Sequence, residues 1–276
     1  MQAVISSIRS VLLYSNAIIT AVAAMMAFRT FRLAGQAPDP WVISLIAAAT
    51  LAVYALHSLA PDERPDGSRA RWNRKARGYH QLCLTVSLAA VIPLFLRIPG
   101  QLILILPAFL LTLYYMAASL LHFPVHGKTM LLAITWTYAT MIMPLLLAGH
   151  VPASSLILPA SILESSYIYL ICLFFDHRDA SVDMPRHWSL NTPRRVHVVT
   201  LMTAIAFLVA FFGAWMAGWP RSWLIIKAIL MFILIATSRY SLQTRSDGWY
   251  YGVLDGMMAL DAICLLFMGE ASILHL

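Results

Sequence analysis

Long apolar runs, separated by short polar stretches, cover almost the whole chain. Each run approaches the 17 to 25 residues that a helix needs to cross the hydrocarbon core of a bilayer. The runs lack the alternation of apolar and polar residues that a membrane β-barrel requires, so we expect helices. Nine spans are predicted, at about residues 10–28, 41–60, 80–97, 101–121, 129–148, 154–175, 197–218, 222–238 and 249–272. We therefore predict an all-α integral membrane protein whose residues 1–276 form one polytopic domain, a single bundle of nine transmembrane helices.

Composition and charge placement add an orientation to this prediction. Hydrophobic residues make up 61% of the chain and charged residues 11%, whereas a soluble domain has about 25% charged residues. The net charge is +7, and most bases fall on the side of the N-terminus, which the positive-inside rule assigns to the cytoplasm. The C-terminus then lies outside after nine crossings. We expect a multi-pass protein of a bacterial inner membrane, with the lipid bilayer as a partner and no nucleic acid.

Carboxylates at helical spacing follow the sixth predicted span, in a hydrophilic cytoplasmic loop at about residues 176–196. If the helix of that span continues, Asp176, Asp179 and Asp183 fall on one face, with Arg178 among them. Carboxylates this close repel one another unless water, bases or a metal ion compensate them. This stretch therefore predicts a cation-binding stripe at a membrane surface.

The loop after the second predicted span, at about residues 61–79, has both acidic and basic groups. Asp62 and Asp66 stand four residues apart, and a cluster of bases surrounds them: Arg64, Arg69, Arg71, Arg74, Lys75 and Arg77. Paired carboxylates can hold Mg²⁺, which bridges to phosphate oxygens while arginine and lysine neutralise the remaining charge. The two loops together thus predict a diphosphate site on the cytoplasmic side. Alternatively, the bases only enforce topology and bind anionic lipid headgroups.

Two polar residues near the cytoplasmic ends of the first two spans are further candidates for substrate binding. Asn16 is predicted in mid-helix, where a polar amide must face the bundle interior. An interhelical hydrogen bond explains Asn16 as well as a ligand role does. His57 lies shortly before the first aspartate loop.

Ionisable residues also occur inside the predicted spans, where they mark functional sites by default. Glu164 lies in the middle or outer half of the sixth span, too far from Asp176 to share a metal ion with it. We expect Glu164 to be protonated or paired, with Lys227 as its partner, and to be structural. Asp255 could reach the pocket on the cytoplasmic side, whereas Asp261 points elsewhere and is expected to be paired or protonated.

The two aspartate loops give the chain a resemblance to the UbiA superfamily of intramembrane prenyltransferases. The segment Asp62-Glu63-Arg64-Pro65-Asp66-Gly67 resembles the second half of the family's first motif, N-D-x-x-D-x-x-x-D. Ser58 and Leu59 stand where the family has its asparagine and its first aspartate, so this motif is degenerate. Asp179 and Asp183, with Asp176 upstream, match the second motif, D-x-x-x-D.

The resemblance implies a prenyltransferase, a transferase of alkyl groups other than methyl, with Mg²⁺ as its cofactor. Asp62, Asp66, Asp179 and Asp183 would be the catalytic metal ligands. The implied partners are a prenyl diphosphate and a lipophilic, typically aromatic, acceptor. The implied substrate-binding residues are Arg69, Arg71, Lys75, Arg178, Asn16, His57 and Asp176.

Two alternatives stay open on the sequence. Some relatives use the same allylic cation intramolecularly, as terpene cyclases. A non-catalytic lipid-binding or transport protein would also fit the degenerate first motif and the buried Glu164 and Asp261. In an enzyme, Tyr114, Tyr115 or Trp136 could stabilise the cation through their aromatic faces.

Overall fold

The computed structural model describes residues 11, 14–60, 68–97, 102–120, 125–147, 154–180, 193–241 and 248–264. These residues form helices and connecting turns, and no strand occurs among them. The first half contains α2 (Ala17–Leu33), α3 (Pro40–Leu59), α4 (Ser68–Lys75), α5 (Arg77–Leu96), α6 (Leu102–Leu120), α7 (Val125–Thr137), the π-helix η1 (Tyr138–Ile142) and α8 (Met143–Leu147). The second half contains α9 (Ser154–Ala180), α10 (Pro193–Met216), α11 (Arg221–Ala236), α12 (Ser238–Ser241), the π-helix η2 (Gly248–Leu254) and α13 (Asp255–Cys264). The prediction of an all-α fold is confirmed for this part of the chain.

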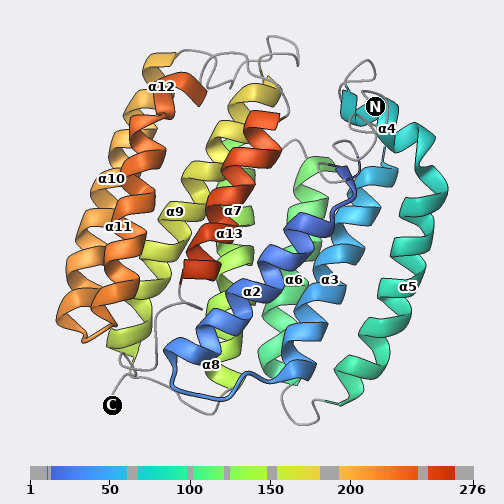
Figure 1. The fold of residues 1–276 in the computed structure, drawn as a ribbon, viewed down its shortest axis with the longest axis horizontal. Coiled ribbons are helices and arrows are strands. Elements are labelled where there is room, and N and C mark those ends of the chain that lie inside the picture. The colour runs from blue at the N-terminus through green and yellow to red at the C-terminus, as the bar shows by residue number, and fades with distance from the viewer. Residues whose placement is uncertain are drawn as a thin grey trace.

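Consecutive long helices alternate in direction (Figure 1), and α3 packs against α5, α7 against α9 and α9 against α10. Within the described ranges, five stretches are long and apolar enough to cross a membrane: Pro40–Leu59, Arg77–Leu96, Gly127–Leu147, Ile157–His177 and Arg195–Met216. Each range predicted as a span overlaps a helix. These long apolar helices indicate a membrane protein, while the number of nine crossings and the sides of the termini stay predictions.

Local sequence signals explain where several helices begin and end. Asp39 accepts hydrogen bonds from the backbone N–H groups of Trp41 (2.8 Å) and Val42 (3.4 Å), and Pro40 occupies the first turn of α3. At the other end of the chain, Gly218 adopts a left-handed conformation (φ +81°) after α10, and the Trp219 N–H bonds back to Ala214. These two caps hold the short turns that let neighbouring helices run antiparallel.

The helices differ greatly in burial. In the apolar part of α9, 61% of the residues are buried, because α7 and α10 pack against this helix. In the apolar part of α5, only 11% are buried. At the contact of α9 with α10, a Cβ added to Gly213 would lie 3.1 Å from Pro159 Cβ, so the small residue allows a close approach. Helix α9 therefore belongs to the core, and α5 exposes an apolar face of the kind that lipid covers.

The start of α2 differs from the prediction. Asn16 does not lie in mid-helix, since it precedes α2 in the left-handed region (φ 62°), which asparagine tolerates better than most residues. The helix also continues beyond the predicted end at residue 28, to Leu33. Arg29 consequently lies within α2 rather than closing it.

Candidate functional site

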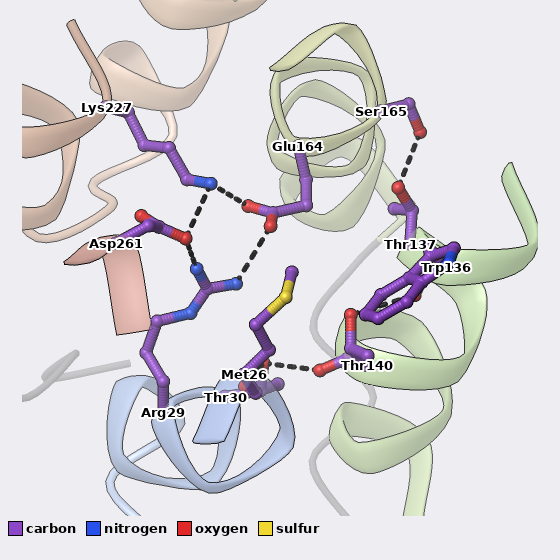
Figure 2. A network of polar contacts seen from close by, with 10 residues as sticks. All are labelled: Met26, Arg29, Thr30, Trp136, Thr137, Thr140, Glu164, Ser165, Lys227 and Asp261. Atoms are coloured by element: carbon purple, nitrogen blue, oxygen red, sulfur yellow. Dashed lines mark hydrogen bonds and ion pairs between the residues drawn. The ribbon is translucent and has the colours of Figure 1, made fainter. Parts of the chain in front are cut away.

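Four ionised side chains from four helices meet in the core (Figure 2). They are Arg29 of α2, Glu164 of α9, Lys227 of α11 and Asp261 of α13, and the side chain of each is 0% exposed. We call this cluster the buried quartet. Its members are up to 232 residues apart in sequence, so only the tertiary fold brings them together.

The buried quartet is a closed ring in which cations and anions alternate. Lys227 Nζ lies 2.6 Å from Glu164 Oε2 and 2.8 Å from Asp261 Oδ2. Arg29 Nη2 lies 3.1 Å from Glu164 Oε1, and Arg29 Nη1 donates to Asp261 Oδ2. Two positive and two negative charges make the ring neutral, which is the condition under which ionised groups can be buried away from water.

Aromatic and polar groups surround the ring. Lys227 Nζ lies 4.4 Å from the centroid of the Tyr167 ring, in a cation–π arrangement, one turn along α9 from Glu164. The Tyr167 hydroxyl, Arg29 Nε and Asp261 Oδ1 are buried without a hydrogen-bond partner in the described part of the chain. The ring is thus satisfied chiefly by its own charges rather than by a wider hydrogen-bond network.

A second set of polar contacts beside the quartet fixes α2 and α9 against the run of α7 and η1 (Figure 2). Thr30 Oγ1 donates to the Thr140 carbonyl oxygen (2.8 Å) and to the Met26 carbonyl oxygen (3.0 Å). Ser165 Oγ donates to Thr137 Oγ1 (2.9 Å). Thr140 belongs to the π-helix η1, whose widened turn disturbs the regular ladder of carbonyl partners, and Thr30 supplies a donor there.

The predicted pairing of Glu164 with Lys227 is confirmed, and Asp261 is paired as expected. Arg29 was not expected in the core, because residue 29 lies just past the first predicted span, 10–28. The signal that could have found it is charge balance. Glu164 and Asp261, the carboxylates expected to be paired or protonated within spans, need two bases, and Lys227 supplies only one.

Most of the predicted metal ligands lie outside the described residues. Asp62, Asp66 and Asp183 fall in undescribed segments, and for Asp179 and Arg178 the structure describes the backbone but not the side chain. Helix α9 continues to Ala180, so Asp176 and Asp179 share one helix as predicted. Among the side chains that the structure does describe, no group of three or more His, Cys, Asp or Glu could hold a metal ion.

Asp176 of α9 and Asp255 of α13 act on one group although they are far apart in sequence. Both interact electrostatically with the Cys172 thiol of α9. The Thr129 hydroxyl of α7 donates a hydrogen bond to Asp176 Oδ2. Negative charge from α9 and α13 is therefore concentrated near the end of α9 that leads to Asp179.

Aromatic rings adjoin these carboxylates. Tyr54 of α3 interacts electrostatically with Tyr115, Cys172 and Asp255, and its ring meets that of Trp136 edge-on at 6.4 Å between centroids. Tyr114, in contrast, is 46% exposed and shares a helical face with the exposed Leu106 and Leu110. Of the three aromatic residues predicted to stabilise a cation, Tyr115 and Trp136 thus lie beside Tyr54, which was not predicted.

The remaining predicted binding residues lie at the ends of α2 and α3 and on α4. Asn16 Nδ2 donates to Ser58 Oγ (3.1 Å), so the predicted interhelical bond exists, and His57 is exposed in the last turn of α3. Arg69 is half-buried, whereas Arg71 and Lys75 are exposed. Figure 1 shows α4 and the C-terminal end of α9 at the same end of the bundle.

Comparisons with known proteins identify no relative of this chain. No family model, curated protein or solved structure matches the chain. The arguments about its function therefore rest on its own residues.

Proposed function

We propose that the chain is an intramembrane prenyltransferase of the UbiA type, with nine spans and its site on the cytoplasmic side. The proposed reaction is Mg²⁺-dependent ionisation of a prenyl diphosphate, followed by transfer of the prenyl group to a lipophilic, aromatic acceptor. The observation that supports it is the placement of Asp176, bound by the Thr129 hydroxyl, on the helix that leads to Asp179. The Tyr54 and Trp136 rings, which meet at 6.4 Å between centroids, add aromatic surface in the bundle, and Asp255 acts electrostatically on Tyr54. Helix α4, whose sequence contains several bases, lies at the same end of the bundle as the C-terminal end of α9 (Figure 1).

Carboxylates are oxygen ligands, which suit Mg²⁺, so the acidic residues of this end fit that ion. In the proposal, Asp62, Asp66, Asp179 and Asp183 hold the ion, which when bound supplies positive charge against the leaving diphosphate. Arg69 and Arg178 neutralise the remaining phosphate charge. Asp176, fixed by the Thr129 hydroxyl, supports the ligands of its own helix.

In the proposal, the apolar and aromatic interior of the bundle protects the carbocation that ionisation produces. Ionisation of the allylic C–O bond leaves a carbocation that water would destroy, so water must be excluded. The faces of Tyr54, Tyr115 and Trp136 can stabilise such a cation through their quadrupoles. The acceptor attacks the cation within the same apolar surroundings.

The test is Mg²⁺-dependent pyrophosphate release from farnesyl diphosphate by the full chain in lipid nanodiscs. We expect release by the wild type and its loss, by at least about 100-fold, in the double variant Asp179→Asn with Asp183→Asn. Asp39→Asn is the matched control, because it removes a carboxylate but keeps a good helix cap. Unchanged release in the double variant would contradict the proposal. Release that needs no acceptor would favour the cyclase alternative.

Transport is a second candidate, and the buried quartet is the observation that favours it, because ionisable residues inside a membrane often serve transported ions or protons. A transporter would keep its activity in the Asp179 and Asp183 double variant and lose it when Glu164 or Asp261 is replaced. Ion pairing of all four quartet members speaks for a fixed structural cluster instead.

A further inference from the structure

Helix α4 sorts its side chains onto two opposite faces. At 100° per residue, positions 71, 74 and 75 share one side and positions 69, 72, 73 and 76 share the other. Burial follows this division: three bases, Arg71, Arg74 and Lys75, are exposed, while Asn73 is buried and Arg69 is half-buried. We call the side of the exposed bases the outer face of α4.

Aromatic packing fixes the rotation of α4, so its outer face keeps its direction. The Trp72 ring lies 6.1 Å from that of Tyr14, 6.1 Å from that of Tyr79 and 5.1 Å from that of His80, measured between centroids. The Tyr79 hydroxyl donates to the Ser15 carbonyl oxygen at 3.2 Å. Helix α4 is thus held by its inner side to α5 and to Tyr14, which precedes α2.

The helix that follows α4 has the exposed apolar surface of a lipid-facing span. Helix α5 follows α4 directly and stands at the edge of the bundle (Figure 1). It exposes a run of large apolar side chains: Leu82, Val86, Leu88, Ile92 and Leu96. Because such a face is covered by acyl chains in a membrane, the end of α5 that adjoins α4 lies at the level of the lipid headgroups.

We propose that the outer face of α4 binds the phosphate groups of anionic lipids around α5. Positive charge complements these headgroups, and the aromatic residues Trp72 and Tyr79 suit the interface next to them. The structure thereby separates two uses of the bases in the first aspartate loop. Arg69 turns toward the interior, and Arg71, Arg74 and Lys75 face the lipid.

This inference does not depend on the proposed prenyltransferase activity, although phosphate is the chemistry common to both. Each base near an anionic surface contributes a factor of about five in lipid affinity at moderate salt. Removal of all three should therefore weaken binding of an anionic lipid on the order of 100-fold. Zwitterionic lipid should bind equally to wild type and variant.

The experiment titrates the detergent-solubilised full chain with phosphatidylglycerol and, separately, phosphatidylcholine, and counts bound lipids by native mass spectrometry. The variant carries Arg71→Gln, Arg74→Gln and Lys75→Gln. The matched control carries Arg97→Gln, Arg195→Gln and Arg221→Gln, which remove three exposed bases elsewhere. We expect loss of tight phosphatidylglycerol binding in the variant alone. Equal loss in the control would overturn the proposal, since it would mean a general effect of net charge.

Two further arms separate lipid from other phosphate sources and from misfolding. Inorganic pyrophosphate with Mg²⁺ should leave phosphatidylglycerol bound to the wild type, and displacement of the lipid would overturn the proposal. Wild-type binding should also weaken between 50 mM and 500 mM NaCl, because screening shortens the reach of exposed charges. Salt-independent binding would contradict the assignment even if the triple variant does not fold.

Discussion

Helix α9 carries two acidic residues, Glu164 and Asp176, whose carboxylates have different kinds of partner. Glu164 faces two cations in a closed neutral ring, with every member fully buried. Asp176, about 18 Å further along the helix by the rise of 1.5 Å per residue, accepts a hydrogen bond from the neutral Thr129 hydroxyl and lies half-buried. Asp176 and a second carboxylate, Asp255, both interact electrostatically with the thiol of Cys172.

This difference separates charges that close a ring within the core from a carboxylate on the helix end that leads to the proposed metal ligands. A neutral ring of four charges is complete and binds its helices together, so it has no need of an added ion. Two carboxylates near one thiol concentrate negative charge, which favours the approach of a cation. The end of α9 is thus where the proposed chemistry would take place, and the quartet, to which Glu164 of the same helix belongs, is its structural counterpart.

The largest effect is expected from breaking the buried quartet. Lys227→Met removes one cation and leaves a net negative charge in the core, which should lower the free energy of unfolding by about 3–5 kcal/mol. Thermal unfolding in detergent, followed by circular dichroism, measures it. Lys75→Met is the control, because that lysine is exposed and its loss should change stability little. Equal stability of both variants would mean that the ring carries no net charge to unbalance.

A smaller effect is expected when the quartet loses one charge of each sign. Lys227→Met combined with Asp261→Asn leaves Arg29 paired with Glu164, so the remaining pair is neutral. The double variant should be more stable than the sum of the single effects predicts, by about 2 kcal/mol in a double-mutant cycle. A same-sign pair, Arg29→Met with Lys227→Met, should show no such compensation. Additive effects in both doubles would contradict the interpretation of the ring as a neutral unit.

The positions of the helices could be predicted from the sequence because apolar runs of membrane length leave few alternatives. The pairing of Glu164 with Lys227 also followed, since an ionisable group in a span needs a partner. Arg29 is harder to assign, because an arginine near the predicted end of a span looks the same as a topology signal, and only the charge balance of the spans points to the core. The helix end at Leu33 places Arg29 within α2.

The candidate metal site shows a different limit of sequence reasoning. Spacing predicted that Asp176 and Asp179 share a helix, and α9 extends through both. Spacing alone could not show that Tyr54, 122 residues before Asp176, adjoins the same region. Contacts between distant helices depend on helix rotation and tilt, which weak amphipathicity in a membrane protein leaves open.

The smallest effect on stability, and the clearest contrast with the quartet, is expected at Asp176. Asp176→Asn keeps an oxygen that can accept the Thr129 hydrogen bond, and the charge that it removes lies outside the buried quartet. The free energy of unfolding should therefore change by no more than about 1 kcal/mol. If Asp176 supports the proposed metal ligands, Mg²⁺-dependent pyrophosphate release should fall about 10- to 100-fold, with part of the loss recovered at higher Mg²⁺. A variant as unstable as Lys227→Met would instead assign Asp176 to the structural class of charges, and the contrast between the two ends of α9 would be lost.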